Sequence, residues 1–163
     1  AKARDIRLEI DAPDVVADIP GDRDELTQLF QNLIDNAIKY GQTGTTVQIT
    51  IVSETQAATT GIGAAALAMT VRNEGEGIAP EHISRLTERF YRVDQARSRE
   101  LGGTGLGLAI SQRIVQRMKG QIGVESAIDE GSTFWFMIDL ALDNTATDPP
   151  LQSDILAGQK ILL

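Results

Sequence analysis

Residues Gln28–Gly41 read QLFQNLIDNAIKYG and have the pattern of a long amphipathic helix. At about 100° per residue, the apolar side chains of this region fall on one side of a helix. A cap at Asp22 or Asp24 and a stop at Gly41 would set its two ends. The predicted buried arc consists of Leu26, Leu29, Phe30, Leu33, Ile34 and Ala37.

A second stripe on the same helix is polar and runs along the edge of the buried arc. It consists of Gln28, Asn32, Asn36 and Lys39, which follow one another at helical spacing. Burying an amide without a partner costs roughly 1–3 kcal/mol, so such a stripe usually holds something. Amide oxygens suit a hard divalent cation, and a lysine suits phosphate. On this stretch alone, an ordinary amphipathic helix with polar flanks is an equal alternative.

Composition and charge restrict the class of protein. The chain has 163 residues, of which 42 % are hydrophobic, and this suits one globular domain. Its formal net charge of −8 argues against nucleic acid or an anionic membrane as the main partner. There is no cysteine, and no apolar run reaches the roughly 20 residues that span a bilayer. We expect a cytoplasmic domain without a signal peptide, and the missing initiator methionine indicates a piece of a longer protein.

Six segments have the alternating or short apolar pattern of β-strands. Ala64–Asn73 is the most apolar of them, and we predict that it is a central strand. The Ala, Thr and Gly residues of Thr55–Gly63 predict a hairpin connection before it. The other predicted strands are Asp5–Ile10, Val15–Ile19 (ended by Pro20-Gly21), Thr45–Glu54, Gln121–Ala127 and Thr133–Leu140, the last two joined across Asp129-Glu130-Gly131.

Two further helices are predicted in the second half of the chain. One begins after Pro80 and runs to about Phe90, and the other spans Gly105–Met118. Three helices on one face of a mostly antiparallel sheet make an α+β two-layer sandwich. We expect this domain to occupy residues 1–142, with residues 143–163 as a linker or tail. The third helix would be buried through Leu106, Ala109, Ile110, Ile114 and Met118.

Two glycine clusters point to a ligand site. Asn73–Ile78 reads NEGEGI directly after the predicted central strand, and its glycines would let a flat ligand approach the backbone. Asn73 can offer both an acceptor and a donor to the edge of a base. Gly102–Gly107 reads GGTGLG at the start of the third helix, where free amides attract phosphate. The cluster is neither a Walker A loop nor a GxGxxG motif. The arginines between the clusters are Arg85, Arg89, Arg92, Arg97 and Arg99.

The order of these motifs resembles that of sensor histidine kinases. The stretches NLIDNAIKYG, NEGEGI, RLTERFYRVD, GGTGLGLAI and EGSTFWF are similar to the N, G1, F, G2 and G3 boxes of that family. The resemblance covers Asp5 to Leu140 and is strongest to phosphate-regulon-type sensors. It implies the GHKL (Bergerat) fold, with ATP and Mg²⁺ held between the long helix and a mobile lid at Val93–Gly103. It also implies histidine kinase activity in two-component signal transduction.

The resemblance assigns roles to the polar stripe of the long helix. Asn36 would be the Mg²⁺ ligand, with Asn32 nearby. Lys39 and Tyr40 would lie along the phosphates and the sugar. Together with Arg97, the residues Asn32, Asn36 and Lys39 form the catalytic set that the resemblance implies.

The glycine motifs receive the base and the phosphates by the same resemblance. Asn73, Gly75 and Gly77 would read the adenine, with Ile78 packed near it. Thr133 would touch the base from the last hairpin. The phosphates would meet Arg92, Arg97 and the amides of Gly103, Thr104, Gly105, Leu106 and Gly107.

Two positions carry information on activity. Relatives of this fold that hydrolyse ATP resemble one another in placing a Glu where this chain has Asn32, and an amide cannot deprotonate water. Asn32 therefore favours a kinase over an ATPase. The first residue of the G1 box is usually Asp in the family, and here it is Asn73. We predict weaker nucleotide binding, because the amide lacks charge assistance worth about 1 kcal/mol.

The phosphoryl acceptor of the family is missing from this chain. The one histidine, His82, follows the G1 box, and we interpret it as a surface residue without a catalytic part. The resemblance implies partners outside the chain, namely a dimerisation and histidine phosphotransfer domain and a response regulator. The isolated domain is expected to be a monomer that binds ATP without labelling itself. The alternatives are a serine kinase of the anti-sigma type and a degenerate nucleotide-binding docking module.

The C-terminal residues beyond Asp143 are rich in Asn, Thr, Asp and Pro, which is typical of a linker. The last five residues, Gln159–Leu163, resemble the first strand of a receiver domain, as found after the kinase in hybrid sensors. A plain C-terminal tail is the alternative.

Overall fold

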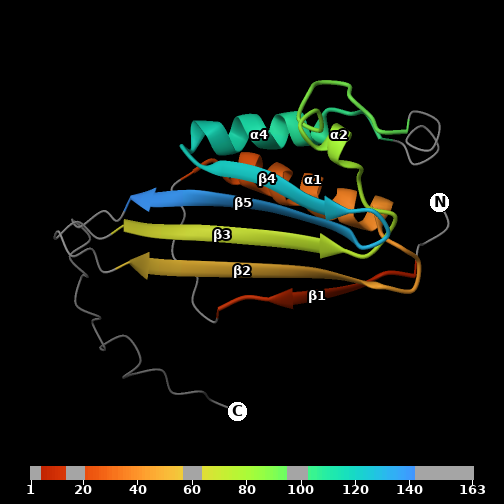
Figure 1. Cartoon of the computed structure of the whole chain (residues 1–163). Coiled ribbons are helices and arrows are strands. Elements are labelled where there is room, and N and C mark those ends of the chain that lie inside the picture. Colours follow the sequence, from red (N-terminus) through yellow and green to blue (C-terminus); the bar gives the residue numbers. More distant parts are fainter. Residues whose placement is uncertain (1–4, 14–20, 57–63, 95–102, 142–163) are drawn as a thin grey trace, which may run out of the picture.

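The computed structural model describes residues 5–13, 21–56, 64–94 and 103–141, drawn in colour in Figure 1. The strand expected at Val15–Ile19, most of the expected lid and the expected linker lie outside these residues. The elements are β1 (Arg7–Asp11), α1 (Arg23–Tyr40), β2 (Thr46–Gln56), β3 (Ala64–Asn73), α2 (Pro80–Ile83), α4 (Gly107–Arg117), β4 (Gln121–Ala127) and β5 (Gly131–Ala141).

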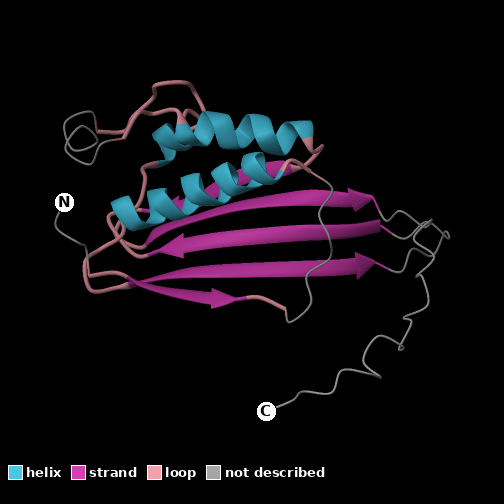
Figure 2. Cartoon of the chain, turned by 180° about the vertical axis from the view of Figure 1, so that it is seen from behind, coloured by secondary structure: helices cyan, strands magenta, loops and turns pink. Residues whose placement is uncertain are grey.

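The strands form one mixed sheet with the order β1-β2-β3-β5-β4. β1 pairs with β2 in parallel, and the other three pairings are antiparallel. The helices α1 and α4 lie side by side over one face of this sheet (Figure 2). The α+β two-layer sandwich is therefore confirmed, and β3 is the central strand, as predicted.

Both ends of α1 follow from local chemistry. The Asp22 carboxylate accepts hydrogen bonds from the backbone N–H groups of Asp24 and Glu25 at 2.8 and 3.2 Å. It thereby satisfies donors that the first turn leaves unpaired. At the other end, the Gly41 N–H donates to the Ala37 carbonyl oxygen at 2.8 Å. Asp22, and not Asp24, is the N-cap residue.

The core lies between the helices and the sheet. Every second residue of the central strands points toward the helices, because side chains alternate between the faces of a sheet. Three of the six residues in the predicted arc of α1 are fully buried, and the other three pack against the core at its margin. The buried apolar side chains are Leu29, Leu33, Ala37, Val47, Ile49, Leu67, Met69, Val71, Ile114, Val115, Phe134, Phe136 and Ile138.

The helix predicted from Pro80 to Phe90 is wrong in its extent. α2 ends at Ile83, and the chain continues as tight turns. Its backbone hydrogen bonds join each donor to the third residue before it, as in Leu86 N–H to the Ile83 carbonyl oxygen at 3.3 Å. Phe90 adopts a positive φ of 65°, which an α-helix does not allow.

α4 begins two residues later than predicted, because Gly105 has a left-handed φ of 71°. Ile114 is buried as expected, but the other four residues predicted to be buried are only partly buried, namely Leu106, Ala109, Ile110 and Met118. Ser111 and Val115 take their places facing the core. Within the described residues, no helix is both long enough and apolar enough to cross a membrane.

Candidate functional site

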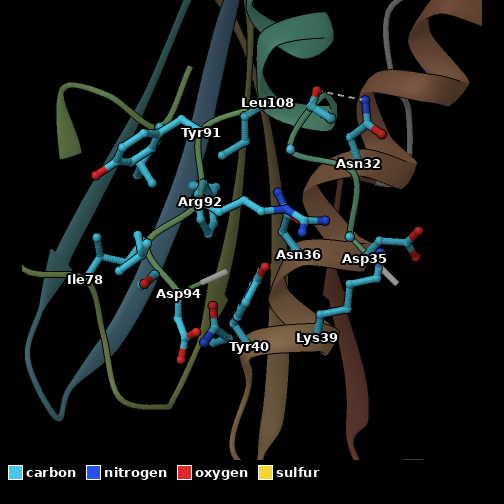
Figure 3. Close-up of a pocket in the computed structure, with 18 of the residues that line it drawn as sticks. Asn32, Asp35, Asn36, Lys39, Tyr40, Ile78, Tyr91, Arg92, Asp94 and Leu108 are labelled. Carbon is cyan, nitrogen blue, oxygen red and sulfur yellow. Dashed lines mark hydrogen bonds between the residues drawn. The ribbon is translucent and has the colours of Figure 1, made fainter. Parts of the chain in front are cut away.

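A cavity of about 350 Å³ lies between α1, the end of β3, the start of α4 and residues 84–94, which we name the F segment. This volume is within the range of small-molecule sites. Figure 3 shows its lining side chains. The predicted site residues that line it are Asn32, Asn36, Lys39, Tyr40, Asn73, Gly77, Ile78, Arg92, Gly103, Thr104, Gly105 and Gly107.

Three predicted site residues are not part of the cavity wall, and a fourth is not described. Gly75, Leu106 and Thr133 do not line the cavity. Arg97 lies outside the described residues. Side chains that the sequence left unassigned also line the cavity, among them Asp35, Glu76, Tyr91, Asp94, Ser132 and Phe134.

Asn32, Asn36 and Lys39 of the polar stripe all line the cavity, and Asn32 also joins α1 to α4. The Asn32 amide donates to the Gly107 carbonyl oxygen at 3.1 Å and to the Ser111 hydroxyl at 3.3 Å. These bonds fasten the first turn of α4 to α1, and Figure 3 marks the bond to the Gly107 carbonyl oxygen. One turn later, Asn36 and Lys39 point into the cavity, and Arg92 reaches toward them from the F segment.

Asn73 is the most buried polar residue on the cavity wall, with 2 % of its surface exposed. Its amide nitrogen donates to the Glu74 carbonyl oxygen at 3.2 Å. Its amide oxygen is buried and accepts no hydrogen bond from the described residues. An unpaired buried acceptor costs roughly 1–3 kcal/mol, so a ligand donor at this position would gain correspondingly.

The two glycines of NEGEGI let the loop after β3 pack closely against other parts of the protein. A Cβ at Gly75 would lie 2.7 Å from the Tyr40 carbonyl oxygen at the end of α1. A Cβ at Gly77 would overlap the Ala127 carbonyl oxygen, and Gly77 also has a positive φ of 70°. Each glycine therefore lets the loop after β3 pack against another segment's backbone, whatever ligand is bound.

Thr133 faces away from the cavity because of the two-residue period of β5. Its neighbours Ser132 and Phe134 line the cavity, so Thr133 points to the opposite face of the sheet. It is in register with Arg72 of β3 and Glu125 of β4, both exposed. Ser132 and Phe134 are the residues of EGSTFWF that face the site. The sequence could have indicated Ser132 through the apolar Phe134 two positions later, because residues two apart share a face of a strand.

Tyr91 forms a wall of the cavity and is held from outside. Its hydroxyl group is hydrogen-bonded to His82 Nδ1 at 2.7 Å. The Arg85 guanidinium lies 4.1 Å from the centre of its ring. The hydrogen bond to the Glu88 carboxylate, 3.2 Å long, raises the pKa of Arg85 and also orients it. His82, expected to be a plain surface residue, is half-buried and supports Tyr91.

The charged groups of the cavity have both signs. Lys39 and Arg92 contribute cations, and Asp35, Glu76 and Asp94 contribute carboxylates. Within the described part of the chain, no three His, Cys, Asp or Glu side chains are grouped to hold a metal ion. A divalent cation here would need the Asn36 oxygen together with oxygens of its own ligand and water, as Mg²⁺ accepts.

The family described as histidine kinase-, DNA gyrase B- and HSP90-like ATPase matches residues 21–142, which include α1 and all the motifs that line the cavity. The chain belongs to this family. This match, together with relatives that are named sensor histidine kinases, confirms the resemblance to that group.

Curated relatives are larger sensor proteins. The chain is 39 % identical over 138 residues to sensor histidine kinase AruS of Pseudomonas aeruginosa, and it covers 13 % of that protein. It is 37 % identical over 131 residues to the phosphate regulon sensor protein PhoR of the same species, and it covers 27 % of it. These alignments take in 85 % and 80 % of this chain. The chain therefore spans less than a third of the length of these relatives.

Solved structures show the same fold. The mycobacterial sensor histidine kinase MprB superposes with a TM-score of 0.66 at 25 % identity, over 85 % of both chains. Full-length ShkA, described as a complex with AMPPNP, superposes with a TM-score of 0.66 at 29 % identity. That match covers 85 % of this chain and 26 % of ShkA.

Proposed function

We propose that this chain is the ATP-binding catalytic domain of a two-component sensor histidine kinase. It would bind ATP with Mg²⁺ and present the γ-phosphoryl group to a histidine of a separate domain. The single observation that carries the proposal is the unpaired, buried Asn73 oxygen in a cavity lined by the N, G1, F and G2 motifs. The AMPPNP in the related ShkA structure supports the choice of nucleotide.

The adenine end of the ligand is assigned to the floor of the cavity. The unpaired Asn73 oxygen suits the amino group of adenine, which is a donor. Ile78 and Phe134 provide apolar surface for the ring, and Tyr91 closes the side. Gly77 contributes its backbone to the same end of the cavity.

The phosphates are assigned to the other end, where the cations and the start of α4 lie. The residues Gly103–Gly107 precede and begin α4, and the N-terminus of a helix attracts anions. Lys39 and Arg92 add positive charge. Asn36 would supply one oxygen to Mg²⁺, which neutralises phosphate charge when bound. Arg97 is proposed to join this end on the basis of its motif.

Phosphoryl transfer is favoured over hydrolysis by the role of Asn32. This side chain is used as a hydrogen-bond donor to Gly107 and Ser111, so it is not a base for water. The domain would act mainly by positioning and electrostatics. Residues 1–142 would form this domain, and residues 143–163 would be a linker or tail. The acceptor hairpin and a response regulator would be its partners.

The test combines binding with transfer. The chain is titrated with ADP, with and without Mg²⁺, and is then incubated with labelled ATP and a separately produced histidine-bearing dimerisation hairpin. We expect Mg²⁺-dependent binding, an acid-labile label on the hairpin, and no label on the chain itself.

Two results would contradict the proposal. Absence of any nucleotide binding would reject the site, and tight binding without transfer would indicate a nucleotide-binding docking module. The matched control is Asn36→Ala beside Gln28→Ala, because both residues belong to the polar stripe and only Asn36 lines the cavity. Gln28→Ala should leave binding and transfer unchanged.

A further inference from the structure

Ser126 makes three hydrogen bonds just behind the cavity floor without lining the cavity itself. Its hydroxyl oxygen lies 2.8 Å from the Ile78 backbone nitrogen and 2.7 Å from the Gly131 carbonyl oxygen. It also lies 2.8 Å from the hydroxyl oxygen of Ser132, its partner across the β4–β5 pairing. A serine hydroxyl has one hydrogen and two lone pairs, so these partners use its full capacity.

The chemistry of these partners determines the direction of each hydrogen. The Gly131 carbonyl oxygen can only accept, so the Ser126 hydrogen must point to it. The Ile78 N–H can only donate, so it occupies one lone pair of Ser126. The remaining lone pair can only accept, and the Ser132 hydroxyl must therefore donate its hydrogen to Ser126.

Ser132 consequently faces the cavity with lone pairs only. It lines the cavity, is 8 % exposed, and has its hydrogen directed behind the wall toward Ser126. The chemistry of its partner also determines the orientation of the Asn73 amide group. Since the Glu74 carbonyl can only accept, the Asn73 amide nitrogen must point to it, and the amide oxygen must face the other way.

The two acceptors lie next to each other. Asn73 of β3 and Ser132 of β5 are directly opposite in the register of the antiparallel pair, and both line the cavity. Opposite residues of such a pair have Cβ atoms about 4.5–5.5 Å apart. The polar part of the floor therefore offers two neighbouring acceptors. It suits an amino group, which carries two hydrogens, and opposes a carbonyl oxygen at the same place.

We propose that Ser126 is a positioning residue that locks the Ser132 hydroxyl hydrogen away from the cavity and thereby makes the site select 6-amino over 6-oxo purine nucleotides. This inference rests on the proposed nucleotide site. Ser126 would touch no part of the nucleotide and would act through Ser132. If Ser126 were replaced by alanine, the Ser132 hydroxyl could rotate and donate a hydrogen into the cavity.

The test compares the binding of ADP with that of IDP, which carries an oxo group in place of the adenine amino group. Neither nucleotide has a γ-phosphoryl group, so only binding is measured. Both affinities are measured by calorimetry with Mg²⁺ for the wild-type chain, Ser126→Ala and Ser126→Thr. We expect the wild type to prefer ADP. In Ser126→Ala this preference should fall about fivefold to tenfold, the effect of one net hydrogen bond, and Ser126→Thr should restore it. Glu125→Gln is the matched control, because Glu125 is exposed on the neighbouring position of β4.

Each other outcome is informative. If Ser126→Ala weakens the binding of ADP and of IDP equally, the variant has lost only structural support for Ile78. That result would overturn the inference. A wild type without preference would overturn it too. If Ser126→Ala does not fold, the test uses Ser132→Ala, which must weaken the binding of ADP more than the binding of IDP. Equal weakening of the two affinities rejects the inference. A wild type that binds neither nucleotide rejects the proposed function itself, a result distinct from ADP binding with an unchanged preference.

Discussion

Asn73 combines two opposing requirements in one side chain. Its oxygen is free for a ligand, whereas its nitrogen is needed by the Glu74 carbonyl oxygen at 3.2 Å. An aspartate would improve the first contact and lose the second. A substitution at this position should therefore change the affinity for the ligand and the stability of the protein in opposite directions.

We predict that Asn73→Asp tightens ADP binding up to about tenfold, because a charged acceptor strengthens the hydrogen bond. The free energy of unfolding without ligand should fall by about 1–3 kcal/mol, because a carboxylate oxygen would face the Glu74 carbonyl with no hydrogen between them. Calorimetry and urea denaturation measure the two effects. An unchanged or weakened ADP affinity would show that the Asn73 oxygen does not meet the base.

The amide nitrogen of Asn32 donates two hydrogen bonds to α4, whereas that of Asn73 donates one to the residue that follows it. We predict that Asn32→Asp lowers the free energy of unfolding by about 1–3 kcal/mol, because a carboxylate cannot donate to the Gly107 carbonyl or the Ser111 hydroxyl. Urea denaturation checks this. Gln28→Glu is the control with the same change of charge, since Gln28 is exposed on the same helix and should show almost no effect. Equal losses would mean that charge alone acts.

At the scale of the elements, the F segment is held by its contact with the residues before α4. The Phe90 N–H donates to the Gly105 carbonyl oxygen at 2.9 Å, and both residues have positive φ angles. A Cβ at Gly105 would lie 2.9 Å from the Phe90 Cα atom. The junction therefore requires glycine for its conformation and for its packing.

Gly44 provides a comparison in which only conformation matters. Its φ is 86°, and a Cβ added to it would meet nothing within 4 Å. We predict that Gly44→Ala costs about 1–2 kcal/mol of folding free energy, the usual cost of a left-handed residue with a Cβ. Gly105→Ala should cost more, because the clash with Phe90 is added, and it should also weaken ADP binding. Equal costs in urea denaturation would show that the F segment moves aside freely.

Elements with a strong period were predictable, and those set by tertiary contacts were not. α1 has a clear helical period and recognisable capping residues, and the strands of the sheet have a clear pattern of apolar residues. The positions of these elements were predicted to within a few residues. The segment after Ile83 has helix-forming residues, but the Phe90–Gly105 contact holds it in turns. Such a contact between distant residues leaves no local signal.

The candidate site was predictable at the level of motifs and less so at the level of single residues. The motifs meet around one cavity, as the resemblance implied. Thr133 was chosen in place of Ser132, a shift of one residue that moves a strand side chain to the other face. Asn32 lines the cavity, but its hydrogen bonds to α4 were not predicted, because a polar stripe alone does not reveal its partner.

At the scale of the molecule, the cavity joins segments that are far apart in the sequence. Its wall includes α1, the end of β3, the F segment, the start of α4 and the start of β5. A ligand that contacts all of them is lost when the chain unfolds. Binding at the site should therefore stabilise the whole domain and not one loop alone.

We predict that ADP with Mg²⁺, at a free concentration of about 100 times its dissociation constant, raises the free energy of unfolding by about 2.7 kcal/mol. The shift should appear as a higher urea midpoint with an unchanged slope, because the same surface is exposed on unfolding. Without Mg²⁺, or in Asn36→Ala, the shift at the same ADP concentration should be smaller, while the midpoint without ligand changes little. An Asn36→Ala variant that keeps the full Mg²⁺-dependent shift would remove Asn36 as the metal ligand, even if ADP still binds.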